Sequence, residues 1–203
     1  MKNKYQKFLA LVACMLAPLA LSAETTQAPD FTLTDTQGNT HSLSDFAGQV
    51  VVLEWLNHGC PFVVKFYEPG KMQSLQERWT SEGVIWLSIN STHPSHRDYL
   101  TPEQEHAKGV SVGSRATAIL HDSDGTVGRA FGARTTPHMF VIDTEGNIVY
   151  NGAIDSIRST NPADIPNATN YVDAALTSLM AGEPIEVSTT RPYGCSVKFE
   201  GVR

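Results

Sequence analysis

Cys60 stands at the junction between two segments of different pattern. The preceding segment 49–55 is continuously apolar and rich in β-branched residues, which predicts a buried strand, and 62–80 carries apolar residues at helical spacing. A cysteine at the start of a helix faces unpaired N–H groups and the positive end of the helix dipole, and both favour the thiolate. Because the thiolate is the nucleophilic form, we expect Cys60 to do redox chemistry rather than to be an inert buried side chain.

The residues around Cys60 suit this interpretation. Pro61 would occupy the first helical position, where its missing N–H leaves no hydrogen bond unmade. Asn57 could hydrogen-bond a reacting sulfur or a peroxide oxygen, or could only hold the turn. His58 could donate to the thiol or acidify it as a cation, and an exposed loop histidine is the alternative.

A second feature is the step Thr136-Pro137, which comes just before the strand-like run 139–142. An X-Pro bond in this position is a natural place for a cis peptide.

The cysteine count depends on the first 23 residues, which have the pattern of a secretory signal. Lysines at positions 2, 4 and 7 precede an apolar run over 8–21 and small residues at 20–23. The run is too short for a good transmembrane span, so we expect a periplasmic or secreted protein. The alternative is a lipoprotein cleavage box that places a lipid on Cys14. After removal of the signal, Cys60 and Cys195 remain, either as a structural disulfide or as a redox pair.

Composition narrows the choice of partners. The chain has 203 residues and a formal net charge of −6, without a basic stripe, which argues against nucleic acid or an anionic membrane as partner. About 180 residues remain after the signal, enough for one domain with a core. We expect this domain over 24–187 and a C-terminal tail over 188–203 that carries Cys195.

Strands and helices are expected to alternate along the chain, which indicates an α/β fold. The predicted helix over 62–80 should kink or break at Pro69-Gly70. The other predicted elements are an N-terminal hairpin over 28–43, a turn or short helix over 44–48, strands over 84–89 and 116–120, a helix opened by Thr101-Pro102, a short helix over 127–131, a hairpin over 139–153 and a closing helix over 170–180.

The chain resembles the redoxin branch of the thioredoxin-like superfamily, which includes exported thiol–disulfide oxidoreductases and the alkyl hydroperoxide reductase/thiol-specific antioxidant proteins. The similarity covers 28–182 and rests on Ala28-Pro-Asp-Phe, Cys60-Pro, Ile119-Leu-His-Asp-Ser-Asp-Gly, Thr136-Pro and Phe140-Val-Ile-Asp. It implies a central mixed sheet flanked by helices, no cofactor, and a cysteine loop that faces the proline loop. Thr136 and Pro137 would then form a ledge for a partner's extended segment, unless the turn serves packing alone.

The chain departs from both chemistries of that superfamily. Thioredoxin-like reductases carry Cys-x-x-Cys at this turn, and here the tetrad is Asn57-His-Gly-Cys60, with asparagine in the first position. Peroxiredoxins place a threonine three residues before the cysteine, where this chain has Asn57. The ending Gly194-Cys195-Ser-Val-Lys198 resembles the tails of related exported redoxin-like proteins, which suggests that the tail returns to Cys60. Gly194 would allow a close backbone approach.

We therefore expect an exported thiol–disulfide oxidoreductase that uses Cys60, with Cys195 as the possible resolving thiol. Its partners would be a thiol or disulfide protein, or a peroxide, and an external thiol reductant. The alternatives are a thiol-dependent peroxidase with antioxidant activity, or a binding module in which Cys60–Cys195 is a permanent staple. Glu54, within an apolar strand, could be a buried proton relay or could face solvent. Four histidines, at 93, 96, 106 and 121, are read as surface residues, so no metal site is expected.

Overall fold

A computed structural model describes residues 26–202 of the chain. The predicted signal segment 1–23 and Cys14 lie outside the described residues. No helix in the described part is long and apolar enough to cross a membrane.

Within residues 26–202, eight strands form one mixed sheet in the order β1-β9-β8-β4-β5-β6-β2-β3. The three central strands β4, β5 and β6 run parallel, and the other neighbours pair antiparallel. The strands of the sheet are β1 (Thr26–Gln27), β2 (Thr32–Asp35), β3 (Thr40–Ser42), β4 (Val51–Trp55), β5 (Ile85–Asn90), β6 (Ala118–His121), β8 (His138–Ile142) and β9 (Asn147–Gly152). A separate pair joins β7 (Thr135–Thr136) to β10 (Cys195–Ser196).

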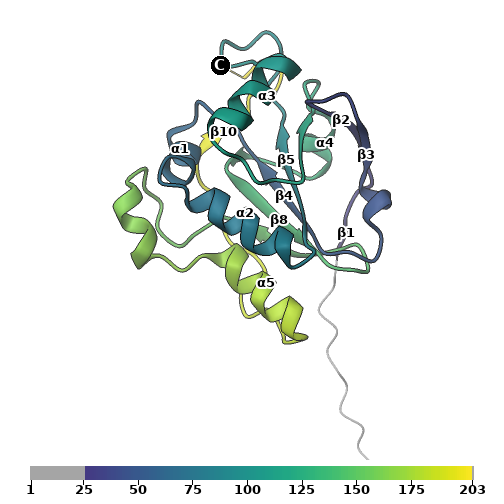
Figure 1. The fold of residues 1–203 in the computed structure, drawn as a ribbon, viewed down its shortest axis with the longest axis vertical. Coiled ribbons are helices and arrows are strands. Elements are labelled where there is room, and N and C mark those ends of the chain that lie inside the picture. The colour runs from purple at the N-terminus through teal and green to yellow at the C-terminus, as the bar shows by residue number, and fades with distance from the viewer. Residues whose placement is uncertain (1–25, 203) are drawn as a thin grey trace, which may run out of the picture.

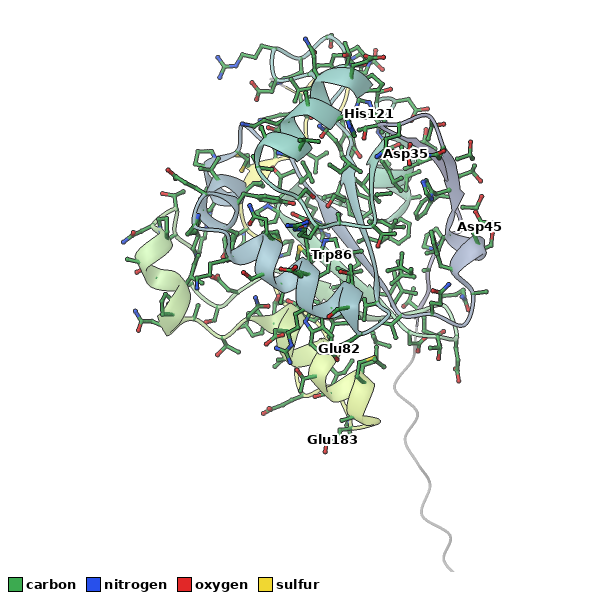
Figure 2. The ribbon with its side chains drawn as sticks, viewed as in Figure 1. Asp35, Asp45, Glu82, Trp86, His121 and Glu183 are labelled. Atoms are coloured by element: carbon green, nitrogen blue, oxygen red, sulfur yellow. The ribbon has the colours of Figure 1, made fainter. Side chains whose placement is uncertain are left out.

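Helices cover both faces of the sheet (Figure 1). They are α1 (Pro61–Tyr67), α2 (Lys71–Ser81), α3 (Pro102–Ser111), α4 (Thr126–Ala130) and α5 (Tyr171–Ala181), with 3-10 turns η1 (Leu43–Phe46) and η2 (Pro162–Asn167). Residues of α1, α2 and α5 pack in the core on one face, and α4 packs in the core on the other. Figure 2 shows Trp86 of β5 behind α2 and His121 of β6 beside α3.

Successive side chains of β4 point to opposite faces of the sheet, so this one strand contributes residues to both cores. Val52 points into the core under α1 and α2, whereas Leu53 and Trp55 point into the core under α4. Because every residue of β4 is buried, its sequence is continuously apolar apart from Glu54. The strand ends at Trp55, opposite Ile89 of β5 and His138 of β8, and the chain then turns into the cysteine loop.

The predicted α/β fold and its central mixed sheet are confirmed. The expected break at Pro69-Gly70 separates α1 from α2, and Gly70 adopts φ 73 there. The capping expected at Thr101 is also present, since its side chain accepts from Gln104 N. The prediction missed the short strands β1, β7 and β10 and the turn η2, and it began the N-terminal hairpin several residues too early.

Candidate active site

Cys60 is the N-cap residue of α1, with an extended backbone at φ −77 and ψ 122, and Pro61 is the first helical residue. The loop before it is held by Asn57, whose Oδ1 accepts from Gly59 N at 2.8 Å and whose Nδ2 donates to Thr92 Oγ1 at 3.0 Å. The carbonyl oxygen of Asn57 also accepts from Cys60 N at 3.0 Å. These bonds agree with the interpretation that Asn57 holds the turn, and they fix the backbone position of Cys60.

No second cysteine lies three residues from Cys60 on either side, since Asn57 precedes it and Val63, which follows it, is buried in the core. The backbone N–H of Val63 donates to the Cys60 carbonyl oxygen at 2.9 Å. The first turn of α1 therefore holds the backbone of Cys60 in place but supplies no second thiol.

The predicted proline turn lies directly against Cys60. The Thr136-Pro137 peptide is cis, as expected, and the Cys60 thiol donates to the Thr136 carbonyl oxygen at 2.9 Å. Thr136 Oγ1 is buried and has no hydrogen-bond partner among the described residues. The cysteine loop and the proline loop, far apart in sequence, thus form one site.

The C-terminal tail completes this site. Strand β10 pairs antiparallel with β7 so that Cys195 lies opposite Thr136 and Ser196 opposite Thr135. Cys60 thus donates to the residue that lies opposite Cys195, and the two thiols are near enough to affect each other's ionisation. Both cysteines are free thiols in this structure, with Cys60 buried and Cys195 half-buried. Figure 1 shows β10 close to the start of α1.

The two thiols have opposite electrostatic environments. Burial opposes ionisation of Cys60, but donors from which the thiolate can accept, on the side chains of Cys195 and Thr136 and on the backbone of Cys195 and Val63, outweigh it and lower the pKa of Cys60. The pKa of Cys195 is raised to about 12. Burial is the main cause, and the neighbouring Cys60 contributes as a hydrogen-bond acceptor and through the negative charge of its thiolate. The arrangement favours a thiolate on Cys60 and a protonated thiol on Cys195.

A buried ion pair anchors the tail on the N-terminal side of Cys195. Lys65 of α1 donates to Asp155 at 2.9 Å and to the Ile157 carbonyl at 3.0 Å, and both charged side chains are almost fully buried. The hydroxyl of Tyr193 donates to the same carboxylate of Asp155. Because Cys60 is the N-cap of α1 and Tyr193 stands two residues before Cys195, this network links the two halves of the site. Sequence reasoning did not identify any of the three side chains.

On the other side of Cys195 the tail enters the second core. Val197 is 3% exposed among the residues around Phe140, and its N–H donates to the Arg134 carbonyl at 3.1 Å. The ring of Phe199 lies under the guanidinium of Arg129, 4.7 Å from its central carbon. Tail residues are thus packed on both sides of the reactive cysteine.

His58 does not reach the thiol through any recorded contact. Its side chain is 4% exposed, so the alternative of an exposed loop histidine is wrong. Its Nε2 lies 3.6 Å from Oε1 of the buried Glu105, and its ring meets Tyr67 edge-on. Burial lowers the pKa of His58, which favours the neutral imidazole and weakens the expectation of a cation beside Cys60.

Glu54 is fully buried, so the alternative that it faces solvent is wrong. Its carboxylate accepts from four side chains, those of Tyr67, Gln76, Trp86 and Ser88, at 2.9–3.2 Å. Burial raises its pKa, although these four donors act in the opposite direction.

The four histidines expected at the surface lie in one loop, one helix and one strand. His93 and His96 are in the loop after β5, His106 is in α3, and His121 ends β6 with its Nε2 2.9 Å from the Glu105 carboxylate. In residues 26–202 there is no cluster of three or more metal-ligating side chains.

The AhpC/TSA family matches residues 25–151, which is more than half of the chain. The thiol-disulfide oxidoreductase ResA of Geobacillus kaustophilus is 30% identical over 122 residues, covering 60% of this chain and 64% of ResA. The match therefore spans less than two thirds of that relative.

Solved structures extend the comparison to most of the described chain. An uncharacterized conserved protein from Geobacillus kaustophilus has a TM-score of 0.75 and 27% identity, over 87% of this chain and 92% of that one. A putative thioredoxin from Neisseria meningitidis has a TM-score of 0.54 and 22% identity, over 77% of this chain and 94% of that one, which shows the common fold. The chain belongs to the AhpC/TSA family of redoxins and has the thioredoxin-like fold.

Proposed function

We propose that this protein is a thiol–disulfide oxidoreductase in which Cys60 is the nucleophile and Cys195 the resolving thiol. The observation that carries the proposal is the pairing of β10 with β7 beside the proline turn, which places Cys195 opposite Thr136, the residue whose carbonyl oxygen accepts from the Cys60 thiol at 2.9 Å. The lowered pKa of Cys60 and its position at the start of α1 support the assignment of the nucleophile.

In the first step, the Cys60 thiolate attacks one sulfur of a substrate disulfide. A Cys60–substrate disulfide forms, the substrate S–S bond breaks, and one substrate thiolate leaves. In the second step, Cys195 attacks the Cys60 sulfur, forms the Cys60–Cys195 disulfide and expels the second substrate thiolate. The proton of Cys195 passes to one departing thiolate and solvent protonates the other, so that the substrate gains two electrons from the two cysteines and is released as two thiols. An external thiol reductant then restores the dithiol.

The surrounding residues have positioning roles in this scheme. Asn57 orders the loop that ends at Cys60, and the backbone of Thr135 and Thr136, just before Pro137, pairs with the strand that carries Cys195. The Thr136 hydroxyl, buried without a partner among the described residues, is a donor that the Cys60 thiolate can use. We assign His58 a positioning role rather than direct contact with sulfur, because its contacts are to Glu105 and Tyr67.

The test is the reduction potential of the Cys60–Cys195 pair. Residues 24–203 are equilibrated in a glutathione series, alkylated and analysed by mass spectrometry, with Cys195→Ser as the control that cannot form the pair. A midpoint above roughly −270 mV, in the range of catalytic dithiols, is expected. A midpoint below about −300 mV would indicate a structural staple instead. Failure to form the disulfide at any ratio would remove Cys195 from the mechanism.

Peroxide reduction is the second candidate, and the burial of Cys60 favours it. Only 2% of Cys60 is exposed, which suits a small oxidant better than a large one. The thiolate would become a sulfenic acid, and Cys195 would condense with it to a disulfide and water. Asn57 in place of the peroxiredoxin threonine weighs against this activity. Peroxide-dependent labelling of Cys195→Ser by a sulfenic-acid probe, absent from Cys60→Ser, would support it.

We also propose export to the periplasm or the cell exterior. The basic start, apolar run and small residues of segment 1–23 support this location. Fractionation followed by N-terminal sequencing is the test, and a mature chain that begins near residue 24 in the exported fraction is expected.

A further inference from the structure

The edge of β7 beside Cys60 is already occupied by this chain's own tail. Extended segments bind exposed strand edges through backbone hydrogen bonds, and the sequence predicted that a partner would use this ledge in that way. Strand β10 takes that place, with Cys195 opposite Thr136 and Ser196 opposite Thr135. The N–H of Val197 continues the pairing to the Arg134 carbonyl at 3.1 Å.

The tail also supplies the sulfur that a bound partner would supply. Cys195 lies opposite Thr136, the residue that precedes Pro137, and the Cys60 thiol donates to the carbonyl oxygen of this same Thr136. A partner segment with a disulfide would need the same backbone edge and the same position for its reactive sulfur. The tail and such a segment therefore exclude each other.

Tight fitting keeps the tail in place. At Gly194, which has φ 146, an added Cβ atom would lie 2.0 Å from the Thr136 carbonyl oxygen, so only glycine permits this approach. Tyr193 and Val197, on either side, are 6% and 3% exposed and belong to the two different cores. Release of the tail would expose both side chains and break the Tyr193–Asp155 hydrogen bond.

We propose that β10 is a resident occupant of the ledge and that it reserves Cys60 for low-molecular-weight disulfides over disulfides within extended protein segments. The inference rests on the proposed function, because it concerns which disulfide the Cys60 thiolate attacks. A small disulfide needs only a path to the sulfur, whereas an extended segment also needs the edge of β7. The rate with such a segment is reduced by the fraction of molecules in which the tail has left.

The step to measure is the first exchange at Cys60. Two probes carry the same leaving group, 2-nitro-5-thiobenzoate, in a disulfide with a cysteine. In the small probe this cysteine is N-acetylcysteine amide, and in the peptide probe it is the central residue of a ten-residue extended peptide. Attack by Cys60 joins the cysteine sulfur to Cys60 and releases the coloured thiolate from either probe.

Two variants form a matched pair, since both lack Cys195 and report Cys60 alone. Cys195→Ser keeps the tail, and a chain that ends at Arg191 removes it but retains Thr190, whose hydroxyl oxygen accepts from Ala153 N. The full-length double variant Gly194→Ala/Cys195→Ser is a second way to displace the tail, should the shortened chain not fold. Circular dichroism and thermal unfolding check the fold of each.

The measured quantity is the rate constant for the small probe divided by the rate constant for the peptide probe. This ratio should be about tenfold or more higher in Cys195→Ser than in the tail-displaced variants. Equal ratios in all three variants would overturn the inference and leave the proposed function intact. Reaction of both probes only after displacement of the tail would show that the tail blocks small disulfides too, which also overturns it. If Cys60 reacts with neither probe in any variant, the proposed function fails, and this inference with it.

Discussion

Replacement of Lys65 by methionine should strongly destabilise the protein, because it leaves a carboxylate buried without its counter-charge. Lys65 Nζ lies 2.9 Å from Asp155 Oδ2, and the two side chains are 0% and 2% exposed. Methionine fills a similar volume in the apolar surroundings of Phe66. The expected change therefore arises from charge rather than from a cavity.

The magnitude follows from what remains around Asp155. After the substitution, the carboxylate keeps the hydrogen bonds from the Tyr193 hydroxyl and from Ile157 N at 3.0 Å, but it has lost its cation. Removal of one partner from a buried ion pair typically costs about 3–5 kcal/mol in the free energy of unfolding. We expect the lower half of this range, since two neutral donors still solvate the charge.

Urea unfolding of the reduced protein at pH 7 measures the effect, with Lys71→Met as the control at an exposed lysine on α2. The control should change the free energy of unfolding by less than about 0.5 kcal/mol. The double variant Lys65→Met/Asp155→Asn keeps an oxygen acceptor for Tyr193 and removes the charge. It should recover about 2 kcal/mol relative to Lys65→Met.

A cost below about 1 kcal/mol for Lys65→Met would refute the reasoning, because the carboxylate would then not depend on this cation. A double variant as unstable as the single variant would show that lost packing, not the unpaired charge, causes the destabilisation. The same samples report on the site, because Tyr193 binds Asp155 two residues before Cys195. Weaker disulfide formation between Cys60 and Cys195 in Lys65→Met, restored in the double variant, is expected.

Three further predictions concern pH and capping. Burial lowers the pKa of His138 from 6.5 to about 4, so its contribution to the free energy of unfolding is complete above pH 6.5 and is lost as the pH falls to 4. Relative to His138→Gln, the wild type should lose about 3 kcal/mol over this range. A difference in urea unfolding that does not change with pH would contradict this. Burial raises the pKa of Glu54 above 4.5, so its contribution is complete below pH 4.5 and lost as the pH rises through the folded-state pKa. The thermal midpoint of the wild type relative to Glu54→Gln should therefore fall as the pH rises from 4 to 8, and a rise would sink the assignment. Thr101→Ala should cost about 1 kcal/mol, because it removes the acceptor for Gln104 N at the start of α3; an unchanged urea midpoint would show that the cap is unimportant.

The sequence predicted the elements whose pattern is set by their own residues. The run Val50–Leu53 has no alternation because β4 is covered on both faces, and this is visible without knowledge of its neighbours. Pro69-Gly70 ends α1 for local reasons as well, since Gly70 adopts a left-handed conformation that begins α2. The position of Cys60 at a helix start follows from the apolar run that ends at Trp55 and from the helical spacing of apolar residues that begins at Phe62.

The missed elements are short and are defined by a distant partner. Each of β1, β7 and β10 has two residues, too few for a period to be recognised. The network of Lys65, Asp155 and Tyr193 was missed for the same reason, because its members come from three distant segments. Lys65 gave one local hint, since it stands in α1 between residues of an apolar run and next to the buried Phe66.

The return of the tail to Cys60 was suggested only by resemblance, yet the last residues contain a physical signal of their own. Tyr193, Cys195, Val197 and Phe199 alternate with polar or small residues, which is the pattern of a half-buried strand rather than of a solvated end. The structure uses this alternation to place Tyr193 in one core and Val197 in the other, with Cys195 between them at the end of the sheet. Alternation can reveal that a tail is packed, but it cannot name the strand on which it packs, because pairing depends on the edge that the rest of the fold leaves open. Here that edge is β7, beside the Cys60 thiol at the start of α1, and this coincidence makes the half-buried tail cysteine Cys195 a candidate for chemistry.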